Sequence, residues 1–231
     1  VEPVSEVATM VTNVEEVLNR LVWLGHDAFR LGGALTVYLD PYQIPGGPLA
    51  DVVLITHDHF DHFSKDDIAR VRKPSTIFVG PPNVVAELSG DTRAVRPGDA
   101  LAIGDLVVET VPAYNVTKFR APGVPFHPRE AGGLGYIITT NGVRVYHAGD
   151  TDLTPEVERV RADIALLPVS GTYVMTAEEA AEAAARIRPQ VAVPMHYGSI
   201  VGSVEDAHRF RELSETRGVS VRILPKEQAS V

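Results

Sequence analysis

Residues 57–62 read His-Asp-His-Phe-Asp-His and directly follow the apolar run DVVLIT at 51–56. His57, His59, Asp61 and His62 form the pattern H-x-H-x-D-H, and imidazole and carboxylate are common ligands of divalent metal ions. Alternation along a continuing strand would place the first three on one face, and a turn would let His62 reach the same cavity. Four such groups are too many for one tetrahedral ion with an open position, so the spacing favours two adjacent ions. The alternative is a polar helix start or a solvated loop.

Two later apolar runs end in side chains of the same kind. VRVYHAGDT reaches Asp150, and VAVPMH reaches His196. Because ligands gather in the crevice at the carboxyl ends of strands, we expect both residues to lie near the histidine motif. A carboxylate offers two oxygens, so Asp150 is predicted to bridge two ions, with His196 completing the second.

Composition limits which metal ligands and partners the chain can use. The 231 residues are 45% hydrophobic and 22% charged, as in an ordinary globular domain, and the net charge is −9. No cysteine is present, which leaves only nitrogen and oxygen ligands and fits an intracellular, cytoplasmic protein. The negative charge argues against sequence-independent nucleic-acid binding. No apolar run approaches the roughly 18 residues of a membrane span, and the start VEPVSEVATM lacks the features of a signal peptide.

The periodicity of apolar residues predicts one α/β domain with sheets inside and helices outside. The DVVLIT run is short and continuously apolar, as expected of a strand buried on both faces. Strands are expected at 21–29, 35–42, 51–56, 75–80, 100–104, 105–111, 135–140, 143–150, 164–171, 191–198 and 219–225. Helices are expected at 65–73, 83–90, 155–162, 176–188 and 204–218. Ser64, Thr154 and Thr176 are the expected N-caps, and Asn141-Gly142 is an expected hairpin turn.

The N-terminal segment has its own pattern. We expect residues 1–20 to form a helical extension of a single domain at 21–231. Apolar residues step by three and four along a heptad-like seam, at Val4, Val7, Val11, Val14, Leu18 and Leu21. A helix packed on its own domain is one interpretation, and a helix that mediates homo-oligomer formation is the other.

These motifs carry a family resemblance. H-x-H-x-D-H, the later G-D-T and the lone late histidine resemble the metallo-β-lactamase superfamily. The segments WLGHDAF, YLDP, THDHFDHFS, PAYN, YHAGDTD and PMHYGS resemble its ascorbate-6-phosphate lactonase-like branch of metal-dependent hydrolases. The resemblance implies a four-layer αββα sandwich of two mixed sheets flanked by helices.

The resemblance also implies a ligand set. His57 and His59 would bind the first metal, Asp61, His62 and His196 the second, and Asp150 both. Asp40, in YLDP, matches a position that buttresses the metal histidines by accepting a distal imidazole N–H. A turn aspartate before Pro41 is the alternative for this residue.

One position departs from the superfamily pattern. Asn115, in VPAYN, stands where a third histidine of the first metal is expected. Asn115 could bind the metal directly, the first metal could hold more water and bind loosely, or His127 could reach in from the following loop. A weakened first site is the prediction that we favour.

The loop at 116–133 is long and rich in proline and glycine, which is typical of functional loops. It carries Lys118, Arg120, His127 and Arg129, which could hold a phosphate or carboxylate of a substrate. A solvated basic loop is the alternative.

Two further residues have a predicted place at the site. His26, after the first strand, is expected to support the metal ligands or line the pocket. Tyr173 is expected to point into the cleft or pack in the core.

The predicted function is a binuclear metal-dependent hydrolase. Two divalent ions would lower the pKa of a shared water, and the hydroxide would attack a small ester, lactone or phosphoester, with Asp61 orienting it. Zinc or manganese is expected, and the nitrogen and oxygen donors also admit iron, cobalt or nickel. The alternatives are a nuclease or nucleotide phosphodiesterase, and a non-hydrolytic metal-binding protein.

Overall fold

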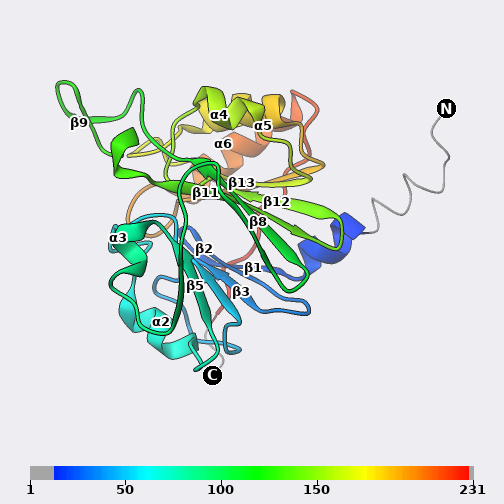
Figure 1. Ribbon diagram of the computed structural model, residues 1–231. Helices are drawn as coiled ribbons and strands as arrows, with labels where there is room; N and C mark the ends of the chain where they lie inside the picture. The colour runs from blue at the N-terminus through cyan, green and yellow to red at the C-terminus, as the bar shows by residue number, and fades with distance from the viewer. Residues whose placement is uncertain (1–12, 229–231) are drawn as a thin grey trace.

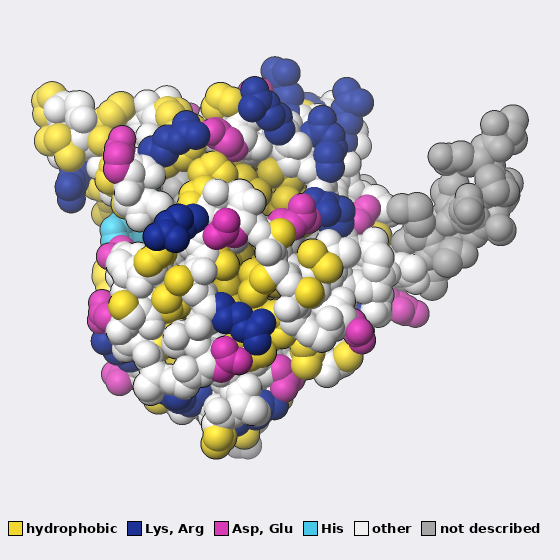
Figure 2. All heavy atoms as spheres, in the orientation of Figure 1, with side chains coloured by type: hydrophobic (Ala, Val, Ile, Leu, Met, Phe, Trp, Pro, Cys, Tyr) yellow, Lys and Arg dark blue, Asp and Glu magenta, His cyan; other side chains and the backbone are white. Residues whose placement is uncertain are grey.

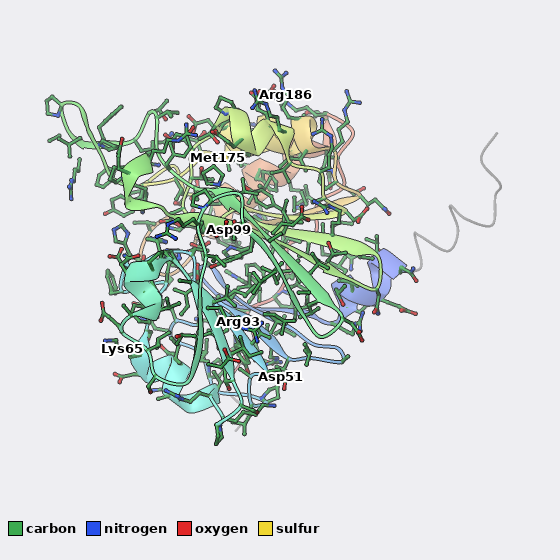
Figure 3. All side chains as sticks on the ribbon, in the orientation of Figure 1. Asp51, Lys65, Arg93, Asp99, Met175 and Arg186 are labelled. Atoms are coloured by element: carbon green, nitrogen blue, oxygen red, sulfur yellow. The ribbon has the colours of Figure 1, made fainter. Side chains whose placement is uncertain are left out.

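Two six-stranded sheets pack face to face with helices on their outer sides (Figure 1). The computed structural model describes residues 13–228. Figure 3 shows the two outer layers through single residues: Lys65 lies on the helical side of the first sheet, and Arg186 on that of the second. The predicted four-layer αββα sandwich is therefore confirmed.

The first sheet is mixed. Its first three strands are antiparallel neighbours, and the later ones run parallel. In spatial order the strands are β1 (Leu21–Gly25), β2 (Ala28–Leu31), β3 (Val37–Leu39), β4 (Val52–Leu54), β5 (Ile77–Gly80) and β6 (Asp91–Ala94).

The second sheet is also mixed, with three parallel strands at one side and antiparallel strands at the other. In spatial order the strands are β14 (Val191–Met195), β13 (Ile164–Pro168), β12 (Val143–His147), β11 (Leu134–Thr140), β8 (Leu106–Pro112) and β7 (Ala100–Ile103). The Asn141-Gly142 turn joins β11 to β12, and both residues have positive φ, as a two-residue hairpin turn requires.

Helices cover the outer faces as α2 (Lys65–Val71), α3 (Pro82–Val85), α4 (Pro155–Arg159), α5 (Ala177–Ile187) and α6 (Val204–Glu215). The predicted N-caps Ser64, Thr154 and Thr176 each accept a backbone N–H, and Thr176 forms a capping box with Glu179. No helix within residues 13–228 is long and apolar enough to cross a bilayer.

The core explains why the strand before the histidine motif is continuously apolar. Val52 and Leu54 pack in the core between the two sheets, while Val53 packs with Ile68 and Val71 of α2. Both faces of β4 are thus buried. The strand delivers the motif to the edge of the sandwich, where the chain must turn.

Three expected elements differ from the structure. The predicted strand at 21–29 is broken at His26 and Asp27, where the chain reverses from β1 into β2, because His26 adopts a positive φ of 50°. The predicted last strand at 219–225 makes only an isolated bridge, from Val221 to Ala192. The loop at 116–133 contains a small hairpin, β9 (Phe119–Ala121) and β10 (Val124–Pro125), and a 3-10 turn, η1 (Arg129–Ala131).

The described part of the N-terminal segment is helical over residues 13–19. Val14, Val17 and Leu18 are buried in the core between the sheets. The remaining seam positions Val4, Val7 and Val11 lie outside the described residues. The division into an extension at 1–20 and a domain at 21–231 stays a prediction.

Candidate metal centre

The polar side chains gather at one edge of the sandwich, where strands of both sheets end. The histidine motif follows β4, Asp150 follows β12, and His196 follows β14. Histidine side chains reach the surface at this edge, below the projecting β9–β10 hairpin (Figures 1 and 2). Residues taken from three distant stretches of the chain thus meet in one place.

Gly149 permits the approach of Asp150. Its φ is +62°, and a Cβ at this position would lie 2.5 Å from the carbonyl oxygen of Leu134. Only glycine fits this turn at the end of β12, so the G-D-T motif is a backbone requirement of the site as well as a ligand motif.

One group of histidines consists of His57, His59 and His127, whose candidate ligand atoms lie within 4.8 Å of one another. The Nε2 of His127 is 3.1 Å from the Nδ1 of His59 and 3.2 Å from Oδ2 of Asp150. We call these three residues the imidazole group.

Asn115 supports the imidazole group from behind. Its Oδ1 accepts hydrogen bonds from the backbone N–H of His127 (2.8 Å) and is 2.9 Å from the Nδ1 of that histidine. Its amide donates to the carbonyl of Tyr173 and to Asp152. Of the three arrangements that the sequence left open, the geometry corresponds to His127 entering the site while Asn115 fixes its ring.

A second group consists of His26, Asp27, His62 and His196, which are all buried and also have ligand atoms within 4.8 Å of one another. Oδ2 of Asp27 lies 3.5 Å from the Nε2 of His62 and 3.9 Å from the Nε2 of His196. We call these four residues the mixed group.

Asp150 lies between the two groups. Oδ1 is 3.4 Å from the Nε2 of His62, while Oδ2 is 3.4 Å from the Nε2 of His196 and 3.2 Å from that of His127. Asp61 is nearer to the mixed group: its Oδ2 is 3.1 Å from the Nε2 of His26 and 3.9 Å from that of His62.

Buried polar partners orient the imidazoles. The Nδ1 of His62 is 2.8 Å from Oδ2 of Asp40, and the Nδ1 of His57 is 2.9 Å from the hydroxyl of Thr56, which itself donates to Asp40. The Nδ1 of His196 is 2.9 Å from the hydroxyl of Ser170. With Nδ1 occupied, each ring presents Nε2 to the interior, which is the arrangement that supports metal-binding histidines.

Burial and neighbouring charge shift the pKa values in opposite directions. Desolvation lowers the pKa of His57 and His127, so both rings are neutral at pH 7 in the metal-free protein. Desolvation also opposes protonation of His62 and His196, but nearby carboxylates outweigh it: the pKa of His62 rises well above its usual value, and that of His196 rises to about 9.

The carboxyl groups divide in the same way. Desolvation would raise the pKa of Asp150, but His196 and His62 together hold it well below the usual value. Desolvation raises the pKa of Asp27 well above its usual value, and His196 offsets this only in part.

Several buried atoms of the cluster lack any hydrogen-bond partner among residues 13–228. They are Nδ1 of His26, both carboxylate oxygens of Asp27, Oδ1 of Asp150, and Nε2 of His57, His62 and His196. Burying polar atoms without a hydrogen-bond partner lowers the stability of the fold, so a group of such atoms that face one another indicates a binding site for an ion or ligand. Imidazole nitrogens and carboxylate oxygens at 3.2–3.9 Å from one another are a donor set that fits divalent metal ions.

Backbone strain is also concentrated here. Within the described range, seven residues other than glycine have positive φ, and four of them, His26, Asp40, Tyr173 and His196, lie at or beside the cluster. Such conformations cost energy and persist where function requires them.

The basic side chains of the loop at 116–133 are engaged away from the histidines. Lys118 pairs with Glu179 at 2.6 Å, and Arg129 pairs with Glu156 at 2.7 Å. Arg120 is exposed on β9. The structure therefore brings His127 from this loop to the cluster, but not its lysine and arginines.

A pocket of ≈ 250 Å³ opens beside the cluster. The ring of Tyr173 packs edge-on against that of Phe126, with 4.6 Å between the ring centroids, and it lines this pocket. Of the two expected placements, pointing into the cleft or packing in the core, the structure has the first. The complete lining is His59, Phe60, Asp61, Phe126, His127, Asp150, Tyr173 and Ile200.

Sequence reasoning missed three residues of the site. Asp27 belongs to the mixed group, Ser170 orients His196, and Asp152 accepts the backbone N–H groups of Val116 and Thr117 at the start of the loop. Asp27 follows Gly25-His26, and turn-forming residues inside an apolar pattern were a signal that the strand is interrupted there.

Comparison with known proteins agrees with the fold. The family described as Beta-lactamase superfamily domain matches residues 20–196. A UPF0173 metal-dependent hydrolase of Methanoculleus marisnigri is 34% identical over 214 residues, covering 88% of this chain and 92% of the relative. One of Methanosphaerula palustris is 33% identical over 216 residues, covering 89% and 96%. A solved structure from Parabacteroides distasonis has a TM-score of 0.78 and 33% identity, covering 90% of this chain and 93% of that one.

The matched region contains every residue of both groups, and the chain belongs to the metallo-β-lactamase superfamily. Within the superfamily, it is similar over most of its length to the UPF0173 metal-dependent hydrolases. The finer assignment to the ascorbate-6-phosphate lactonase-like branch stays a prediction.

Proposed function

We propose that the chain is a binuclear metal-dependent hydrolase of small esters or lactones. The observation that carries the proposal is the convergence of Nε2 and carboxylate atoms that have no hydrogen bond within residues 13–228 and lie 3.4–3.9 Å from one another. The imidazole group, His57, His59 and His127, would hold one divalent ion. His62, His196 and Asp61 would hold the second, and Asp150 would bind both. This set retains the ligands expected from the sequence and replaces Asn115 by His127.

Bound at these residues, divalent ions would lower the pKa of water and polarise the bond to be cleaved. The side chains of this protein would orient the attacking water. Asp61 is held by His26 at 3.1 Å and lines the pocket, so its carboxylate can accept a proton from the attacking water and keep it directed at the substrate.

Pocket chemistry supports a neutral substrate over a phosphoester. Phe60, Phe126, Tyr173 and Ile200 give the pocket an apolar wall. Lys118 and Arg129, which could have held an anion, are neutralised by Glu179 and Glu156. An acyl or alkyl group of a small ester or lactone matches this lining.

The experiment measures hydrolysis of p-nitrophenyl acetate, p-nitrophenyl butyrate, γ-butyrolactone and bis-p-nitrophenyl phosphate, with and without chelator. We expect ester or lactone hydrolysis that chelator abolishes and Mn²⁺ or Zn²⁺ restores. Phe126→Ala should raise KM for the butyrate ester more than for the acetate, because it removes apolar wall. The exposed Val107→Ala, far from this pocket, is the matched control.

The contrary outcomes separate the alternatives. Cleavage of the phosphodiester and of a labelled oligonucleotide, without ester hydrolysis, would identify a nuclease or phosphodiesterase. Metal binding without turnover of any of these substrates would identify a non-hydrolytic metal-binding protein. Metal identity, a cytoplasmic location and a homo-oligomeric state stay predictions of the sequence.

A further inference from the structure

We propose that Asp27 is a direct ligand of the second ion, so that this ion is held by a carboxylate-rich set and the first by an imidazole-rich set. The inference rests on the proposed metal centre, and it adds a ligand outside the H-x-H-x-D-H, G-D-T and late-histidine motifs.

The Asp27 side chain is completely buried, at 0% exposure. Neither of its oxygens has a hydrogen-bond partner in the described part of the chain. A buried carboxylate is normally hydrogen-bonded or bound to a metal, because burying it without such a partner is strongly unfavourable. An aspartate with no hydrogen bond to either oxygen from the described residues, facing the Nε2 atoms of His62 and His196 in a folded interior, therefore points to a cation that it binds with them.

The distances match ligands that share one ion. Donor atoms about 2.1 Å from an ion lie about 3.0–3.6 Å apart at coordination angles of about 90–120°. The 3.5 Å from Asp27 Oδ2 to the Nε2 of His62 lies within this range, and the 3.9 Å to that of His196 lies slightly above it. These separations exceed those of good hydrogen bonds, about 2.7–3.2 Å, and all three atoms face one another.

The surrounding chain fixes Asp27 in this position. His26 adopts a φ of 50°, which turns the chain between β1 and β2, and its carbonyl accepts from the indole of Trp23 (2.9 Å) and the backbone N–H of His196 (3.1 Å). The carbonyl of Asp27 itself accepts from the Nε2 of His147 at 2.9 Å. The backbone is thus held on both sides by hydrogen bonds while the carboxylate is left without any from residues 13–228.

The position of Asp27 changes the chemistry of the second site. His62 and His196 would share their ion with Asp27, Asp61 and Asp150, whereas the imidazole group meets only Asp150. Oxygen-rich sets favour harder ions such as Mn²⁺, and imidazole-rich sets suit Zn²⁺. The two positions should therefore differ in metal preference.

The test titrates chelator-treated protein with Mn²⁺ alone, following stoichiometry and affinity by calorimetry and by the EPR signal of free Mn²⁺. Wild type should bind two equivalents. Asp27→Asn should lower the affinity for the second Mn²⁺ ion on the order of 100-fold and leave the affinity for the first unchanged. This loss is the upper end of the effect of removing a residue that only supports a ligand, and removal of a ligand should reach at least that size. Asp58→Asn is the matched control, because it makes the same change from carboxylate to amide. Asp58 is exposed, and its carboxylate accepts a hydrogen bond from the side chain of Asn83.

Thermal unfolding of the metal-free proteins separates ligation from a structural role. Replacing a buried carboxyl group that has no hydrogen bond from the described residues should leave the metal-free Tm unchanged or raised, while the Tm increase on adding Mn²⁺ should shrink. Asp27→Ala should behave in the same way and provides a second variant. A lower metal-free Tm with unchanged Mn²⁺ affinity would overturn the proposal, and failure of both variants to fold would equally assign Asp27 a structural role.

The outcomes for wild type keep this inference distinct from the proposed function. Two equivalents bound with equal affinity by wild type and Asp27→Asn would refute the role of Asp27 and leave the binuclear hydrolase standing. No Mn²⁺ or Zn²⁺ bound by wild type would overturn both proposals.

Discussion

The imidazole group and the mixed group lie side by side at one edge of the sandwich and differ in charge. The imidazole group consists of three histidines, and His59 is exposed. The mixed group is completely buried and contains Asp27, with Asp61 and Asp150 beside it. His57, His127, His62 and His196 are all buried. Desolvation nevertheless lowers the pKa of His57 and His127, whereas nearby carboxylates raise the pKa of His62 and His196.

This difference teaches that burial alone does not set the protonation state of a buried histidine. A buried ring that faces only the carboxylate of Asp150 becomes neutral, and a ring that faces two carboxylates keeps its proton. Metal ions compete with protons for the same nitrogens, so the two groups should bind metal with different pH dependence and different selectivity.

The largest expected effect comes from removing the residue that joins the two groups. Asp150→Ala should abolish binding at both positions, because each of its oxygens faces imidazoles that would share an ion with it. We expect activity to fall by at least about 100-fold and metal content to fall from two equivalents towards none, measured by elemental analysis after dialysis. Unchanged metal content in Asp150→Ala would refute the bridging position. Asp163→Ala, at a carboxylate away from the cluster, controls for loss of a charge.

A smaller and one-sided effect is expected from Asn115→Ala. Asn115 touches neither the mixed group nor Asp150 in its hydrogen bonds, but its oxygen holds the backbone and ring of His127. Loss of this hydrogen-bond partner should lower the affinity for the first ion by about 10–100-fold, which is the typical effect of removing a residue that supports a metal ligand. The affinity for the second ion should stay unchanged. The second ion is thus the internal control in a two-site Zn²⁺ titration. Equal weakening of both ions would mean that Asn115 supports the fold of the whole edge.

The smallest expected effect is a difference in proton release at pH 7. The pKa of His196 is raised to about 9, so its ring is protonated below that pH, and an ion must displace this proton to bind. Second-site affinity should therefore rise about tenfold per pH unit up to pH 9 for each proton released. Burial lowers the pKa of His57 and His127, so these rings are already neutral at pH 7 and an ion has no proton to displace there. Calorimetry in buffers of different ionisation enthalpy measures both, and equal proton release at the two sites would contradict the comparison.

Much of the fold could be predicted from local patterns. The apolar run before His57 predicted a doubly buried strand, Thr176 and Glu179 predicted the start of α5, and Asn141-Gly142 predicted the β11–β12 turn. These signals depend on neighbours in sequence. The predicted strand at 219–225 was wrong, because Val221 makes only an isolated bridge to Ala192, and pairing with a strand that precedes it by about 30 residues is not a local property of the sequence.

The site divides in the same way. Strand ends deliver His57, Asp150 and His196 to one edge, and sequence reasoning placed all three there because each follows an apolar run. Other features position His127 and Asp27. His127 lies in the loop just after the β9–β10 hairpin, and Asp27 lies where the chain reverses between β1 and β2, which the apolar pattern does not reveal.

The sequence by itself determined that imidazoles and carboxylates follow buried strands, because hydrophobic periodicity and strand direction are local properties. Only the tertiary structure decided that Asn115 turns to His127, that Lys118 and Arg129 are occupied by glutamates, and that Asp27 faces His62 and His196. These contacts join residues far apart in the chain, and their distances are set by the packing of one sheet on the other.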